Sequence, residues 1–152
     1  MSNLSNQTGL GIAQTAVTFS EAMEGVPYKL GGKDERGLDC SGFVTYVFKM
    51  VFPEKATQFV TSAAGFSENA LFEKVTEPVA GDLIFFKRSE EGQVHHVGIV
   101  LNNQYWVGSQ SSTGVAKVSF KNPYWSKEVI TYGRYKHSSP QAINAYLASL
   151  KK

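Results

Sequence analysis

The only cysteine of this 152-residue chain, Cys40, stands in the stretch L-D-C-S-G-F-V, directly before an apolar run. Phe43, Val44 and Val47 fall on one helical face, which predicts a helix that begins near Cys40. At a helix start, unpaired backbone N–H groups and the helix dipole favour a thiolate, so we expect a lowered pKa for this thiol. The same N–H groups can bind the oxyanion of an attacked amide. On position alone, a packed and inert cysteine is an equal alternative.

A thiol nucleophile needs a base, and the chain offers His95, His96 and His137. The first two lie in a predicted strand, V-H-H-V-G-I-V, where adjacent side chains point to opposite faces. We therefore expect at most one of them to face Cys40, and each can also be an ordinary hydrogen-bonded histidine. His137 lies in a polar turn and is expected to be solvated. Two adjacent histidines and one distant cysteine match no common zinc spacing, so we predict no metal and no cofactor.

Helices at both ends and strands between them are predicted to position these residues. Ile12, Ala16, Phe19 and Met23 recur at helical spacing, and Ser139-Pro140 begins a closing helix through Leu150. A weaker pattern predicts a short helix around 66–72. Gly81 and Asp82 are interpreted as a turn that supports the fold. Short β-rich segments then predict about five mainly antiparallel strands, over residues 82–87, 94–101, 104–109, 115–120 and 129–135. This order predicts an α+β fold, with residues 1–152 as one domain.

Composition excludes several classes of partner. Fifteen Lys and Arg against 13 Asp and Glu give a net charge of +2 without a dense basic run, which argues against nucleic acid. No stretch approaches the ~20 apolar residues that span a bilayer, so we expect no membrane partner. The N-terminus lacks the charged and apolar parts of a secretory signal. We therefore expect a protein that is made in the cytoplasm and does not leave the cell by the ordinary signal-peptide route.

Four motifs occur in an order and spacing that resemble the NlpC-type, papain-like family of bacterial cell-wall cysteine peptidases. They are G-V-P-Y-K-L-G-G, L-D-C-S-G-F-V, A-G-D-L-I-F-F and H-V-G-I-V, and the resemblance covers roughly residues 25–120. Four ordered motifs are far more specific than one. The resemblance implies a compact papain-like fold, in which the cysteine lies on a helix packed against an antiparallel sheet that carries the histidine.

The resemblance also implies roles for single residues. The histidine directly before Val-Gly is the base in family members, which selects His96 as the partner of the nucleophile Cys40. Tyr28 looks placed to bind substrate or to support the oxyanion, and Asp39 and Ser41 would hold the amino group and backbone of the substrate. The alternatives from the residues alone are Tyr28 as a core residue and Asp39 as a plain helix N-cap.

The chain departs from the family pattern at the third catalytic position. Family members commonly place a histidine on the next strand, where it orients the base, but here Gly108 stands at that position. Gln110 shares the strand face of Gly108 and is our candidate for the orienting role. Ser109, a backbone carbonyl, or no third group at all are the alternatives.

Relatives cut amide bonds in peptidoglycan stem peptides, typically between D-γ-glutamate and meso-diaminopimelate, through a thioester. We expect the same here, with the diaminopimelate to D-alanine cross-link as the alternative bond. A small domain without an export signal resembles the amidase toxins of type VI secretion, which act in the periplasm of a target bacterium and are blocked by an immunity protein in the active-site groove. A cytoplasmic recycling peptidase, a catalytic domain of a larger exported enzyme, an acyltransferase of the same superfamily and an inactive wall-binding module remain alternatives.

Overall fold

The computed structural model describes residues 2–23, 26, 28–29, 33–34, 37–52 and 62–136. His137 and the predicted closing helix lie outside these residues. The described helices are α1 (Ser2–Ala22), α2 (Cys40–Val51) and α3 (Ala63–Glu68), none of which is long and apolar enough to cross a membrane. The strands are β1 (Lys33–Asp34), β2 (Gly37–Leu38), β3 (Phe72–Val75), β4 (Leu83–Lys87), β5 (Val94–Val100), β6 (Tyr105–Gln110), β7 (Gly114–Ser119) and β8 (Val129–Tyr135).

The larger sheet has six strands in the order β3-β8-β4-β5-β6-β7, and each adjacent pair is antiparallel. The five predicted strands are all present, so the predicted α+β class is confirmed. β3 was not predicted, and the helix expected around 66–72 lies earlier, in α3. Ser62 caps α3, since its hydroxyl accepts from the Gly65 N–H at 3.0 Å, and the Asn69 side chain accepts from the Leu71 N–H at 2.8 Å in the turn that leads to β3.

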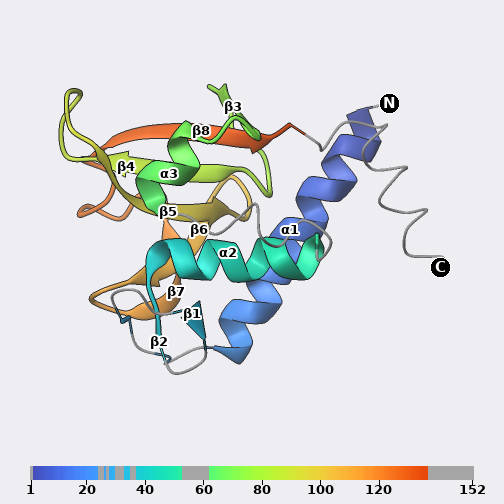
Figure 1. Cartoon of the computed structure of the whole chain (residues 1–152), viewed down its shortest axis with the longest axis horizontal. Coiled ribbons are helices and arrows are strands. Elements are labelled where there is room, and N and C mark those ends of the chain that lie inside the picture. Colours follow the sequence, from blue (N-terminus) through green and yellow to red (C-terminus); the bar gives the residue numbers. More distant parts are fainter. Residues whose placement is uncertain are drawn as a thin grey trace.

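Both faces of the sheet are covered by apolar side chains. On one face, α1 and α2 pack against the strands, and the apolar stripe of α2 is fully buried through Phe43, Val44, Val47 and Phe48. Figure 1 shows α1 crossing α2 beside the sheet. The opposite face carries a smaller cluster, with Ile84, Phe86, Val100, Trp106 and Val118.

The sheet divides between β5 and β6, and this division positions the site. These strands pair only at Ile99 with Val107 and at Val100 with Trp106, so the first half of β5 and the end of β6 are not paired with each other. The first residue of α2 is Cys40, and Figure 1 places that end of the helix beside β6 and β7. A helix start can therefore approach the unpaired backbone of β5.

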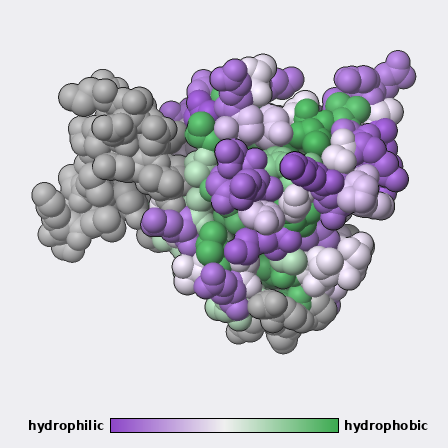
Figure 2. Space-filling model, turned by 180° about the vertical axis from the view of Figure 1, so that it is seen from behind, coloured by the Kyte–Doolittle hydropathy of each residue, from purple (hydrophilic) through white to green (hydrophobic). Residues whose placement is uncertain are grey.

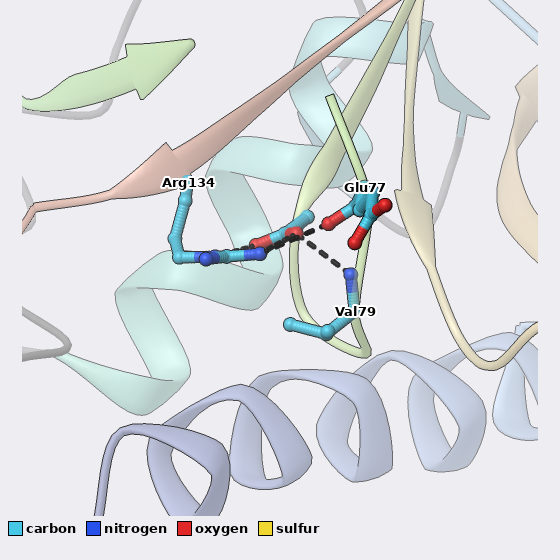
Figure 3. Close-up of polar contacts among 4 residues, drawn as sticks. Glu77, Val79 and Arg134 are labelled. Atoms are coloured by element: carbon cyan, nitrogen blue, oxygen red, sulfur yellow. Dashed lines mark hydrogen bonds and ion pairs between the residues drawn. The ribbon is translucent and has the colours of Figure 1, made fainter. Parts of the chain in front are cut away.

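The turn before β4 is held by an ion pair to the last described strand, β8. Both Asp82 carboxylate oxygens accept from the Arg134 guanidinium at 3.0 Å, and Asp82 also accepts from the Val79 N–H at 2.8 Å (Figure 3). Gly81 has φ 93°, which favours glycine. These contacts agree with our interpretation that Gly81 and Asp82 support the fold.

Candidate active site

Cys40 is the first residue of α2, and the residues on either side of it form the helix cap. Asp39 is the N-cap, and its carboxylate accepts from the Gly42 N–H at 2.5 Å and from the Ser41 hydroxyl at 3.1 Å. This geometry satisfies one of the unpaired N–H groups of the first turn. Asp39 and Ser41 therefore fix the backbone on both sides of the thiol, whatever they contribute to substrate binding.

The thiol of Cys40 is buried against β5, with 8% of the residue exposed. Burial raises the pKa of Cys40 above its ordinary value, and the Asp39 carboxylate adds to the rise, while the backbone N–H groups of Val97, Ser41 and Cys40 itself act in the opposite direction. Our expectation of a lowered pKa is thus wrong for this structure, because desolvation outweighs the helix N-terminus. The hydrogen bond from the Val97 N–H also shows that the thiol lies beside Val97, the residue that follows His96.

A bulge in β5 brings both strand histidines to one indole ring. Phe86 pairs with His96 and Lys87 pairs with Val94, so His95 is an extra residue opposite β4. The ring of Trp125 stacks on His96 with 4.5 Å between centroids and on His95 with 6.2 Å. We expected the side chains of His95 and His96 to point to opposite faces of the sheet. This expectation is wrong here, because such alternation holds only for a regular strand and β5 has a bulge at His95.

A hydrogen-bond chain fixes which nitrogen of His96 carries the proton. The Thr113 hydroxyl donates to the Gly114 carbonyl at 2.9 Å and accepts from the Gln110 amide nitrogen at 3.2 Å. The Gln110 amide oxygen is thereby directed at His96 Nε2, 3.2 Å away, and an amide oxygen only accepts. His96 Nε2 must donate, which leaves Nδ1 as the basic nitrogen of the ring.

Gln110 occupies the space above Gly108. A Cβ atom added at Gly108 would lie 2.7 Å from the Gln110 Oε1 atom, closer than real Cβ contacts allow. Gln110 is 1% exposed, so its amide is held inside the protein. The Gln110 amide therefore occupies the space that a side chain at position 108 would need, so glycine at 108 and glutamine at 110 fit together.

His96 is enclosed by aromatic rings, and this surrounding sets its protonation. Besides Trp125, the rings of Phe86 and Trp106 lie with centroids 5.7 Å from that of the imidazole. Burial lowers the pKa of His96 to about 4, neighbouring His95 also lowers it, and the Gln110 hydrogen bond acts in the opposite direction. The imidazole is therefore neutral at pH 7, as a base for a neutral thiol must be.

Tyr28 lies close to Cys40. It forms a bridge with Leu38, two residues before Cys40. Burial raises the pKa of the Tyr28 phenol, and the charges of Cys40 and Asp39 raise it further. The phenol therefore remains protonated at pH 7 and can donate a hydrogen bond near the thiol.

Two further residues at the site were missed in the sequence, because they come from a turn without a motif. Trp125 and Glu128 both precede β8, in the segment N-P-Y-W-S-K-E. Glu128 Oε1 lies 2.5 Å from His95 Nε2, and its side chain is 10% exposed. His95 is thereby held by a carboxylate while the neighbouring ring of His96 is held by an amide. Two adjacent aromatic residues in a polar turn are the only sequence signal that could have indicated a role for this segment.

A groove opens beside His96, and we call it the histidine groove. Its lining includes Tyr28, Arg88, His95, His96, Gln110 and Lys117. Another hollow lies against α3, β3 and β8, with Phe72 and Phe85 among its lining residues. Within the described residues, no three His, Cys, Asp or Glu side chains are grouped so as to hold a metal ion.

Comparison with known proteins gives one consistent family. Residues 25–134 match the model of the NlpC/P60 family. The chain is 35% identical to a probable endopeptidase of Haemophilus influenzae, over 82% of this chain and 77% of the relative. It is 33% identical to the murein DD-endopeptidase MepS/murein LD-carboxypeptidase of Escherichia coli, over 68% of this chain and 53% of the relative. The solved NlpC/p60 domain of the peptidoglycan hydrolase SagA matches with a TM-score of 0.58 and 28% identity, over 78% of this chain and 96% of that domain.

Proposed function

Because this chain belongs to the NlpC/P60 family, we propose that it is a peptidoglycan hydrolase that cuts an amide bond of the stem peptide through a thioester on Cys40. The observation that carries the proposal is the hydrogen-bond chain from Thr113 through Gln110 to His96. It leaves a neutral imidazole with a free basic nitrogen on the strand that contacts the thiol. The names of similar proteins, which are endopeptidases of murein and peptidoglycan, support the substrate class.

The reaction follows from these protonation states. Nδ1 of His96 takes the thiol proton as the Cys40 sulfur attacks the amide carbon. The N–H groups at the start of α2 and the phenol of Tyr28 stabilise the oxyanion. Imidazolium then protonates the leaving amine, the C–N bond breaks, and a thioester remains. Neutral His96 finally removes a proton from water, which hydrolyses the thioester and restores the thiol.

We propose the bond between D-γ-glutamate and meso-diaminopimelate as the site of cleavage. The murein DD-endopeptidase among the similar proteins favours a second candidate, the cross-link between diaminopimelate and D-alanine. Digestion of isolated monomeric and cross-linked muropeptides, followed by mass spectrometry, distinguishes them. Cleavage of monomers into an L-alanyl-D-glutamate fragment supports the first bond, and conversion of cross-linked dimers into intact monomers supports the second. Intact muropeptides of every type would overturn the proposed function.

Delivery to another cell remains a separate proposal, in which the chain acts in the periplasm of a target bacterium after type VI secretion and is blocked by an immunity protein. It is tested by producing the chain in Escherichia coli with and without an added periplasmic signal, next to a Cys40→Ala control. A toxin of this kind lyses cells only when it is both exported and intact. Harmless export of the active protein would contradict a toxin role.

A further inference from the structure

Cations flank His96 on both sides within the sheet. Arg88 directly follows β4, the neighbour of β5, and Lys87 before it pairs with Val94. Lys117 lies on β7, two strands away from β5 on the other side, because the strand order is β4-β5-β6-β7. Lys117 pairs with Val107, which pairs with Ile99, so the two cations lie toward opposite ends of β5 and can face different parts of one ligand seated at His96.

The lining of the histidine groove carries positive charge without an opposing carboxylate. Arg88 and Lys117 line it, and none of its described lining residues is Asp or Glu. The one carboxylate that approaches from the 121–128 turn, Glu128, is bonded to His95. Glu90 and Glu91 follow Arg88 in the same turn but do not line the groove, and no ion pair among the described residues engages Arg88 or Lys117.

The remaining lining combines the apolar side chains of Val118, Tyr124 and Trp125 with polar ones. Ser111, Ser112 and Thr113 form the exposed turn between β6 and β7, and Asn122 lies in the turn before β8. On the face of the molecule that Figure 2 shows, hydrophilic and hydrophobic side chains are interspersed. Hydroxyl and amide groups can hydrogen-bond a peptide, while the guanidinium and ammonium groups select the sign of its charge.

The negative charge of the site lies beside the thiol. Asp39 caps α2 directly before Cys40, next to Tyr28, whose phenol its charge influences. The site thus places an acidic group beside the nucleophile and basic groups along the groove that continues from the base. A peptide with a free amino group on the acyl side and carboxylates on the leaving side matches this separation of charge.

We propose that the histidine groove is a carboxylate-selective subsite, in which Arg88 and Lys117 bind the free carboxylates on the leaving-amine side of the stem peptide. This inference rests on the proposed function and deepens it, because it names the charge state of the diamino acid that the chain selects. Stem peptides whose leaving-side carboxylates are amidated are poor substrates for this protein.

The test compares two synthetic peptides, L-alanyl-D-γ-glutamyl-meso-diaminopimelate with its diaminopimelate carboxylates either free or amidated. We expect kcat/KM to be about tenfold higher for the free acid, mainly through KM, because exposed ion pairs each contribute modestly. The doubly substituted protein Arg88→Gln/Lys117→Gln should lose this preference, so that its kcat/KM values for the two peptides are equal. Lys49→Gln, at the far end of α2, removes one positive charge outside the groove and should keep the preference.

A binding measurement separates failure of this inference from failure of the proposed function. In Cys40→Ala protein, calorimetry should show about tenfold tighter binding of the free acid, and Arg88→Gln/Lys117→Gln should abolish the difference. Equal affinities for both peptides would overturn the carboxylate subsite, as would a preference that survives loss of both cations. A clear binding preference without any hydrolysis by the intact protein would instead overturn the proposed reaction and leave the subsite standing.

Discussion

Gln110 is our candidate for the residue that orients His96, and its neighbours show how its amide is held. The amide oxygen lies over Gly108 and accepts from His96, while the amide nitrogen is fixed by Thr113. The orienting position could be inferred from the sequence because residues 108 and 110 share one strand face. Thr113, which determines the direction of the amide, was not identified because its contribution depends on the turn after β6.

Substitution of Gln110 should separate orientation from acid–base chemistry. We expect Gln110→Ala to lower kcat by about tenfold, less than the ~10²- to 10⁴-fold that a general acid–base group contributes. Gln110→Glu should raise the His96 pKa, because a nearby carboxylate favours imidazolium. Steady-state kinetics and histidine NMR titration measure both effects, with Gln104→Ala, an exposed glutamine in the turn between β5 and β6, as the control. Wild-type rates and an unmoved His96 pKa in both variants would rule out the orienting role.

The pH dependence of the reaction follows from the lowered His96 pKa. Only neutral imidazole accepts the thiol proton, and the pKa of His96 is about 4 rather than the ordinary 6.5. Activity should therefore persist through pH 5 and decline as the pH falls through about 4, because protonation then removes the base. A profile of kcat/KM between pH 3.5 and 8 measures this decline, which forms the acid limb of the profile. A limb near pH 6.5 would mean that His96 is hydrated in the working enzyme.

At the scale of elements, the strands were predictable and their irregularities were not. Short segments rich in β-branched and aromatic residues predict β4 to β8, but the bulge at His95 depends on how β5 pairs with β4, which no single segment reveals. The edge strand β3 was missed because two of its four residues, Glu73 and Lys74, are charged and exposed. A short edge strand of this kind has little apolar periodicity to detect.

The turn before β8 controls the environment of the base through Trp125. Trp125→Leu removes the ring that stacks on His96 at 4.5 Å, so water can reach the imidazole and its pKa should rise from about 4 toward 6.5. The acid limb of the rate profile should move to higher pH by the same amount. Tyr124→Leu removes the neighbouring exposed ring, which contacts Trp125 edge-on, and should move the limb much less. Equal shifts in the two variants would assign the effect to the turn as a whole.

At the scale of the whole molecule, the Asp82–Arg134 pair joins the turn before β4 to β8. Asp82 is 2% exposed and serves both Arg134 and the Val79 N–H, so Asp82→Ala leaves a partly buried cation and a backbone donor unpaired. We expect a loss of about 1–3 kcal/mol in the free energy of unfolding, which is the usual cost of leaving a buried polar group without its partner. Urea denaturation measures it.

Glu77 provides the matched control for that pair. Arg134 contacts only its backbone carbonyl, at 3.3 Å, so Glu77→Ala should leave the free energy of unfolding within about 0.5 kcal/mol of the wild type. An Asp82→Ala protein as stable as the Glu77→Ala protein would show that the ion pair does not hold the turn.

The motifs predict the nucleophile and the base, but they do not predict the histidine groove. Arg88, Gln110, Lys117 and Trp125 come from different strands and turns, and only the order of the sheet brings them to one surface. The raised pKa of Cys40 was missed for a related reason. A helix N-terminus is visible in the sequence, whereas the burial that outweighs it depends on the packing of α2 against β5.

The most direct test of the account compares wild-type protein with Cys40→Ala, His96→Ala and His95→Ala on one purified muropeptide, with products identified by mass spectrometry. We predict that wild-type protein cuts the stem peptide and that loss of Cys40 or His96 lowers the rate by about 10³-fold or more. His95→Ala should stay within about tenfold of wild type, because His95 is held by Glu128 and does not contact Gln110 in the described hydrogen-bond chain. Turnover that survives loss of Cys40, or a larger loss from His95→Ala than from His96→Ala, would contradict the account.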